Sequence, residues 1–171
     1  STPLLLFPSL FLSKDMVNAE CATCAPLLEA AVSKLPLAVP LRDYRMTSRF
    51  GPRTDPFNRR VAFHAGLDFA ARYGAPVHAT VAGKVIYAGW RGGYGRFVEI
   101  ESANGLTTRF AHLSAINVEE GDDVEFQQVI GKLGNSGRSS GPHLHYEVRI
   151  DGEAYDPENF INAGHYVFAQ S

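Results

Sequence analysis

The chain has 171 residues, of which 45% are hydrophobic and 20% are charged, and its formal net charge is −2. This composition is typical of one globular domain with a hydrophobic core, with or without an appended segment. The negative balance and the lack of a basic stripe argue against a nucleic-acid-binding protein. No apolar run approaches the ~20 residues of a membrane-spanning helix, so we expect no membrane span in this chain.

The N-terminal part of the chain differs in composition from the rest, because the first 50 residues contain no glycine and all 16 glycines follow them. Residues 13–41 are predicted to form a packing helix with an apolar stripe that includes Leu35, and Pro36 and Pro40 are expected to end it. We therefore expect residues 1–44 to be a helical segment left from a longer chain, and residues 45–171 to form the main domain.

Two cysteines, Cys21 and Cys24, lie in the stretch "CATC" of this segment. A thioredoxin-type motif would need a preceding βαβ unit, and a zinc half-site would need a second pair of ligands, and the sequence offers neither. The favoured interpretations are two small buried residues or a local disulfide in an oxidising compartment.

From about residue 45 the sequence consists of short strands separated by turns that contain glycine, such as "RFVEIES", "LTTRFAHL" and "DDVEFQQVIGKLG". Asp151-Gly152 is predicted to be a hairpin turn. No segment between residues 50 and 155 has the length and period of a helix. We therefore expect a mainly β domain, an antiparallel barrel or sandwich.

Histidines mark the candidate functional strand, "SSGPHLHYEV" at residues 139–148. Residues two apart in a strand point to the same face, so His143 and His145 are expected to project side by side, in the phase that also holds Glu147 and Arg149. Elsewhere, His64 precedes Asp68 by four residues, and His112 ends a strand. A His–Asp pair and one histidine of the 143/145 strand would supply the three ligands of a catalytic zinc site. His78 and His165 are predicted to have no functional role. Spacing alone leaves the metal site undecided.

The stretches "HAGLD", "RFAHL" and "SGRSSGPHLHYEV" together resemble the M23 family of zinc metallopeptidases, of the lysostaphin or LytM type, over residues 47–161. The resemblance implies that His64, Asp68 and His145 are the zinc ligands and that His112 and His143 are catalytic histidines outside the ligand set. It also implies a curved antiparallel β-sheet domain of the barrel-sandwich (duplicated hybrid motif) type, with a narrow groove over one zinc ion.

Two departures from the family pattern concern the residues around the metal. Phe110 stands where many members carry a tyrosine, and its ring is still expected to wall the site. No tyrosine precedes His64 in "DPFNRRVAF", so Arg59, Arg60 and Tyr94 become candidates for stabilising the oxyanion.

The glycine-rich "GWRGGYGR" at residues 89–96 lacks the ending of a phosphate-binding loop and is predicted to border the groove.

The resemblance implies an endopeptidase that hydrolyses peptide stems or cross-bridges of bacterial peptidoglycan, and we favour a D,D-endopeptidase that acts in the periplasm or outside the cell. Envelope regulatory proteins are further expected partners. The alternative is a non-catalytic LytM-type activator of a cell-wall amidase, but such proteins typically lack some ligands, whereas this chain keeps all five histidine and aspartate positions. A biotinyl or lipoyl carrier is a second alternative, which is disfavoured because neither Lys84 nor Lys132 stands in a carrier motif.

Overall fold

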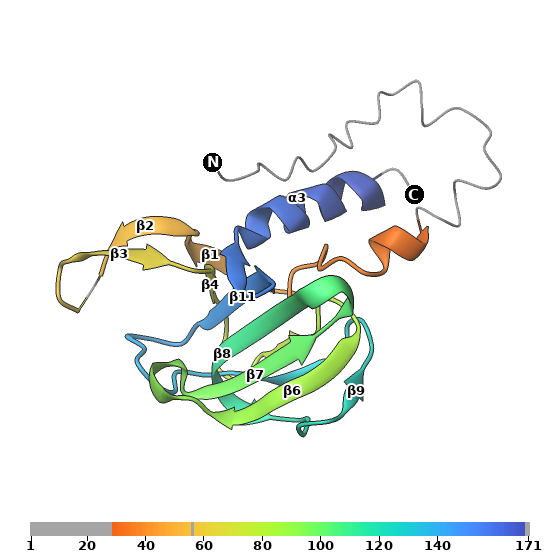
Figure 1. The fold of residues 1–171 in the computed structure, drawn as a ribbon. Coiled ribbons are helices and arrows are strands. Elements are labelled where there is room, and N and C mark those ends of the chain that lie inside the picture. The colour runs from red at the N-terminus through yellow and green to blue at the C-terminus, as the bar shows by residue number, and fades with distance from the viewer. Residues whose placement is uncertain (1–28, 56, 170–171) are drawn as a thin grey trace. The chain divides into compact units, whose positions relative to one another are not determined.

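The structure is a computed structural model that describes residues 29–55 and 57–169. Val32–Ser171 forms a compact unit that contains every strand of the described residues (Figure 1). The region predicted from the sequence to be rich in strands is therefore one folded unit. No helix in the described part of the chain is long and apolar enough to cross a membrane.

Antiparallel strands build this unit, as expected from the short alternating segments. Seven strands of a ten-stranded sheet lie side by side in this order: β1 (Arg45–Ser48), β4 (Leu67–Ala70), β11 (Leu144–Ile150), β8 (Leu106–Ile116), β7 (Arg96–Glu101), β6 (Gly83–Trp90) and β9 (Asp123–Val124). β10 (Val129–Leu133) pairs with both β8 and β5 (Pro76–His78), and β12 (Glu153–Tyr155) pairs with β11. The prediction of a mainly β, antiparallel domain is confirmed.

A separate two-stranded sheet consists of β2 (Gly51–Thr54) and β3 (Val61–His64), which Figure 1 shows beside β1 and β4. Two short 3-10 helices connect successive strands: Gly92–Tyr94 lies between β6 and β7, and Ala103–Gly105 lies between β7 and β8. The predicted hairpin is confirmed, because Asp151 and Gly152 join β11 to β12 with φ angles of 50° and 82°. Positive φ at both central residues is the geometry of a type I′ turn.

Strand β11 separates the core from the functional site. Leu144, Tyr146 and Val148 belong to the hydrophobic core, while the alternate side chains of His145 and Glu147 are also buried but point to the opposite face. The Tyr146 hydroxyl is hydrogen-bonded to Thr80 Oγ1 at 2.8 Å, which satisfies its polar atom inside the core. The alternation read from the sequence is thus the actual division between packing and chemistry.

A C-terminal helix, α3 (Pro157–Phe168), was not predicted from the sequence. Asp156 is its N-cap, with the side chain accepting a hydrogen bond from Glu158 N at 3.0 Å, and Pro157 occupies the first turn. This Asp-Pro-Glu signature is the local signal that would have located the helix. Ile161 anchors it in the core.

The predicted helix over residues 13–41 is wrong for its described C-terminal part, because helical backbone there covers only residues 29–32. Pro36 disfavours helical backbone at Leu35, which is 42% exposed and does not form part of a packed stripe. Leu37 and Leu41 are buried instead, and the Pro40 carbonyl accepts a hydrogen bond from His78 N at 2.8 Å. The rest of the predicted helix, with both cysteines, lies outside the described residues.

Candidate metal centre

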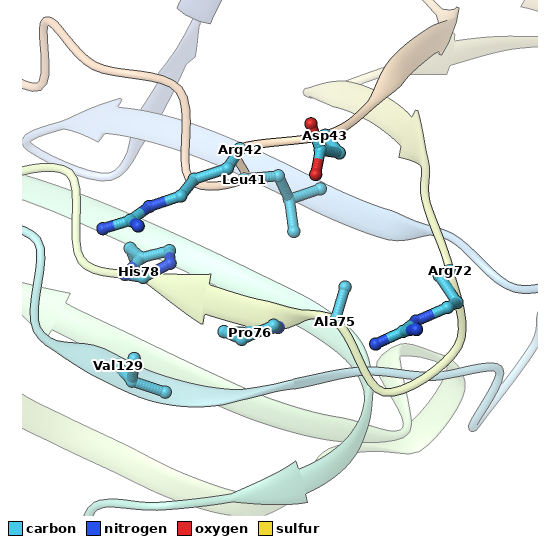
Figure 2. Close-up of a pocket in the computed structure, with 8 residues that line it drawn as sticks. All are labelled: Leu41, Arg42, Asp43, Arg72, Ala75, Pro76, His78 and Val129. Atoms are coloured by element: carbon cyan, nitrogen blue, oxygen red, sulfur yellow. The ribbon is translucent and has the colours of Figure 1, made fainter.

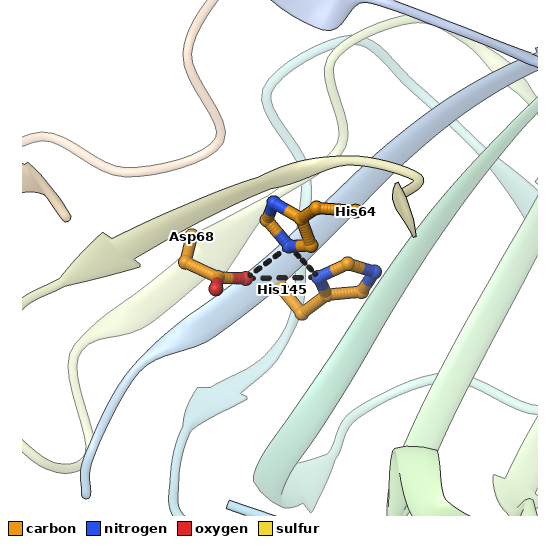
Figure 3. Close-up of side chains that lie close together, drawn as sticks. All are labelled: His64, Asp68 and His145. Carbon is orange, nitrogen blue, oxygen red and sulfur yellow. Dashed lines mark hydrogen bonds and ion pairs between the residues drawn. The ribbon is translucent and has the colours of Figure 1, made fainter. Parts of the chain in front are cut away.

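Three strands bring His64, Asp68 and His145 together. His64 is the last residue of β3, and His145 lies directly opposite Asp68 in the register between β11 and β4. All three side chains are buried. Figure 3 shows their converging atoms, with His64 Nε2 lying 3.1 Å from both Asp68 Oδ1 and His145 Nδ1, and the latter two atoms 2.8 Å apart.

The donor set of this triad fits a divalent metal ion. His64 Nδ1 donates to the Arg49 carbonyl at 2.7 Å, and His145 Nε2 donates to Glu147 Oε1 at 2.8 Å. In the neutral rings, the two nitrogens that face each other therefore carry lone pairs. Ligands at about 2.0–2.2 Å from a tetrahedral zinc lie about 3.4 Å apart, close to the observed separations. Two imidazoles and one carboxylate also leave a position for water.

The same surroundings raise the pKa of His145 to about 8. Burial by itself would lower this pKa, but the hydrogen bonds to Asp68 and Glu147 outweigh it. Burial by itself would raise the pKa of Asp68, but the contacts with His145 and His64 outweigh it and hold this pKa well below its usual range. Asp68 is therefore ionised at neutral pH, which is the state that a metal ion requires.

Two further side chains hold the triad in place. Arg53 on β2 donates from Nη1 to Asp68 Oδ2 at 3.1 Å and to Ser48 Oγ at 2.8 Å, which leaves Asp68 Oδ1 facing the histidines. Glu147 is completely buried and also accepts from Tyr94 Oη at 2.9 Å and from Arg149 Nε at 2.6 Å. Neither residue was predicted from the sequence to have a role, although the strand alternation places Glu147 on the face of His145.

His112 and His143 lie together at the edge of the triad, with ring centroids 4.7 Å apart. His112 Nδ1 donates to the Ser136 carbonyl at 2.7 Å, and His143 Nδ1 donates to the Gly141 carbonyl at 2.9 Å. In both neutral rings the lone pair is therefore on Nε2, and His143 Nε2 lies 3.9 Å from Asp68 Oδ1. Burial lowers the pKa of His112 to about 4, so this ring is neutral at pH 7 and able to accept a proton.

The residues named as departures from the family pattern have different positions. Phe110 does not wall the site, because its ring is fully buried in the core with its centroid 5.4 Å from that of Tyr146. Arg59 and Arg60 are exposed in the turn between β2 and β3. Tyr94 is the oxyanion candidate nearest the triad, since its ring centroid lies 5.9 Å from that of His145.

Two small cavities flank the triad, each close to one of the two outer histidines. A cavity of about 280 Å³ is lined by Arg53, Gly93, Tyr94, His112, Arg138 and His145. The other, of about 270 Å³, is lined by Asp68 and His143 and by Ser140, Gly141 and Pro142 of the preceding loop. The glycine-rich loop at residues 89–96 thus borders the site through Gly93, as predicted from the sequence.

A third cavity, of about 500 Å³, lies elsewhere, between residues 41–43 and strand β5. Figure 2 shows Arg42 and His78 at one end and Arg72 at the other. Neither the triad nor the pair of His112 and His143 contributes to its lining. Four of the five candidate site residues, Asp68, His112, His143 and His145, line the two smaller cavities instead.

The comparisons with known proteins agree with this arrangement. The description "Peptidase family M23" matches residues 62–157, more than half of the chain. The "DD-carboxypeptidase/endopeptidase Mpg" of Neisseria meningitidis is 47% identical over 118 residues, which are 69% of this chain and 27% of that protein. The chain therefore spans about a quarter of the length of this curated relative.

Solved structures show the same similarity. A zinc-containing peptidase from Vibrio cholerae is 40% identical with a TM-score of 0.65, over 69% of this chain and 37% of that one. The catalytic domain of lysostaphin from Staphylococcus simulans is 34% identical with a TM-score of 0.64, over 70% of this chain and 92% of that one. The chain therefore belongs to peptidase family M23, as its sequence, its fold and the residues at its site all indicate.

Proposed function

We propose that this chain is a zinc-dependent D,D-endopeptidase that hydrolyses peptide cross-links of bacterial peptidoglycan in the cell envelope. The observation that carries the proposal is the convergence of His64 Nε2, Asp68 Oδ1 and His145 Nδ1 beside two histidines whose Nε2 atoms carry lone pairs. The name of the Neisseria relative and the zinc-containing relative from Vibrio support the reaction and the metal. Envelope regulatory proteins remain predicted partners.

In this proposal His64, Asp68 and His145 hold the zinc ion. Bound zinc supplies a Lewis acid for the scissile carbonyl and makes water acidic enough to attack near neutral pH. Arg53 keeps Asp68 Oδ1 turned toward the metal by holding Oδ2. Glu147 keeps the Nε2–H tautomer of His145, so that Nδ1 is the ligand atom.

The two outer histidines carry the proton transfers. The Nδ1–H groups of His112 and His143 are held by backbone carbonyls, so each ring can accept a proton at Nε2. One takes the proton of the attacking water and one returns a proton to the leaving amine. The small, polar loop beside His143 leaves room for an extended peptide.

The direct test is a digest of purified cross-linked muropeptides with the zinc-loaded protein, with and without a chelator, read by mass spectrometry. We expect chelator-sensitive conversion of dimers to monomers. If dimers stay intact while pentaglycine is cut, the assignment of the bond is wrong. If the folded, zinc-loaded protein cuts neither substrate, the role of an amidase activator replaces that of an enzyme.

A further inference from the structure

The two cavities that flank the triad differ in charge. Arg53 and Arg138 both line the cavity that contains His112, and among the described residues no carboxylate lines it. On the His143 side, the lining beyond the triad and Arg53 is neutral and mostly small: Thr47, Ser48, Ala70, Ser140, Gly141 and Pro142. A substrate that lies across the triad therefore meets a basic half and a neutral half of the groove.

Arg138 is held firmly in the basic half. Its backbone N–H donates to the Gly93 carbonyl at 2.7 Å, which ties its loop to the glycine-rich loop that also borders the cavity. Its guanidinium carbon lies 4.7 Å from the centre of the Phe57 ring. Nη2 contacts both oxygens of Asp55 at 3.2 Å, and backbone N–H groups of the β2–β3 turn in turn fix Asp55. This side chain is thus placed in advance and loses little freedom when it binds a ligand.

Arg138 can still bind a second carboxylate. Its contacts with Asp55 use only one of the three guanidinium nitrogens, and 54% of the side chain is exposed. A guanidinium carries five N–H donors in a planar fork that matches a carboxylate. Arg53 adds positive charge at the border of both cavities, with 37% of its side chain exposed.

We propose that the Arg138 side of the groove binds a free carboxylate on the residue whose amino group leaves; this inference rests on the proposed function. A D,D-carboxypeptidase acts on a peptide whose last residue carries its carboxylate one carbon from the scissile nitrogen. A cross-linked peptide presents the same group when the residue after the scissile bond keeps a free α-carboxylate. One basic subsite would serve both reactions, with the acyl half of the substrate over the neutral loop of Ser140, Gly141 and Pro142.

Matched synthetic peptides that end in D-Ala-D-Ala test this subsite, one with a free C-terminal carboxylate and one with a carboxamide. We expect the zinc-loaded protein to cleave the acid with a kcat/KM about tenfold higher than the amide, as one charge-assisted contact provides. Arg138→Gln should remove this preference by raising KM for the acid alone. Arg138→Lys should restore part of it, and Arg72→Gln, in the third cavity, is the matched control that should leave it unchanged.

Equal cleavage of the acid and the amide by the unsubstituted protein, or a preference that survives Arg138→Gln, would overturn the inference. Thermal melting of each variant shows whether it is folded. If the zinc-loaded protein cleaves neither peptide, it has no carboxypeptidase activity, and the digest of cross-linked muropeptides still tests the proposed function separately. Calorimetric titration of both peptides into chelator-treated protein then decides the inference, since tighter binding of the acid that Arg138→Gln abolishes supports it and equal binding refutes it.

Discussion

Glu147 is expected to influence how tightly the metal ion is bound, although it supplies none of the three converging ligand atoms. Its carboxylate is completely buried and accepts hydrogen bonds from His145 Nε2 at 2.8 Å, Tyr94 Oη at 2.9 Å and Arg149 Nε at 2.6 Å. Burial would raise the pKa of Glu147, but the hydrogen bonds and charges of His145 and Arg149 lower it to about 2. The group is therefore a permanent buried anion at neutral pH.

Two substitutions separate its effects. Glu147→Gln keeps an acceptor oxygen for His145 but removes the charge, and loss of such a partner typically weakens metal binding by about 10–100-fold, or about 1.4–2.7 kcal/mol. Glu147→Ala also leaves His145 Nε2–H and Arg149 Nε–H without their acceptor. Breaking a buried ion pair from one side costs about 3–5 kcal/mol, which lowers the melting temperature of a domain of this size by about 6–20 °C.

Chelator competition measures the metal affinity, and thermal unfolding in excess chelator measures stability without the contribution of the metal. Glu153→Gln, an exposed position on β12, is the matched control and should change neither quantity. The carboxylate does not orient His145 if both Glu147 variants have a zinc affinity within about twofold of that of the unsubstituted protein and the same melting temperature. Loss of stability without loss of affinity would show that its role is only structural.

Three further outcomes are expected. His64→Ala, Asp68→Ala and His145→Ala should each lower the zinc content below one ion per chain, and full zinc in all three by elemental analysis would contradict the ligand assignment. His112→Ala and His143→Ala should keep the zinc but lower kcat by about 10²–10⁴-fold. If these variants instead lose the metal and added zinc restores it, His112 and His143 are ligands. In metal-free protein, the pKa of His145 rises from 6.5 to about 8 on folding, so its stabilisation is complete below pH 6.5 and is lost as the pH passes about 8. Urea unfolding in chelator should therefore show a loss of roughly 2 kcal/mol between pH 6.5 and 9, and an equal loss in His145→Gln would refute the assignment.

Much of the fold and of the site could be predicted from the sequence because the signals are local. The alternation in β11 separates Leu144 and Tyr146 from His145 and Glu147 without any knowledge of neighbouring strands. Asp151-Gly152 specifies its turn through the backbone angles that these residue types tolerate. Apolar spacing predicts more helix than residues 29–41 contain, because Pro36 and Pro40 disfavour helical backbone there, and the start of α3 is marked by its cap at Asp156 and not by an apolar period.

The sequence by itself determined the kinds of residue at the site and the family to which they belong. The tertiary structure decided which atoms meet, because that depends on the register between β11 and β4, which sets His145 opposite a residue 77 positions away in the chain. It also decided which nitrogen of each histidine faces the groove. For His64 and His112, the backbone carbonyls of Arg49 and Ser136 make that choice, and their position depends on how distant segments pack, which residue type and spacing do not encode.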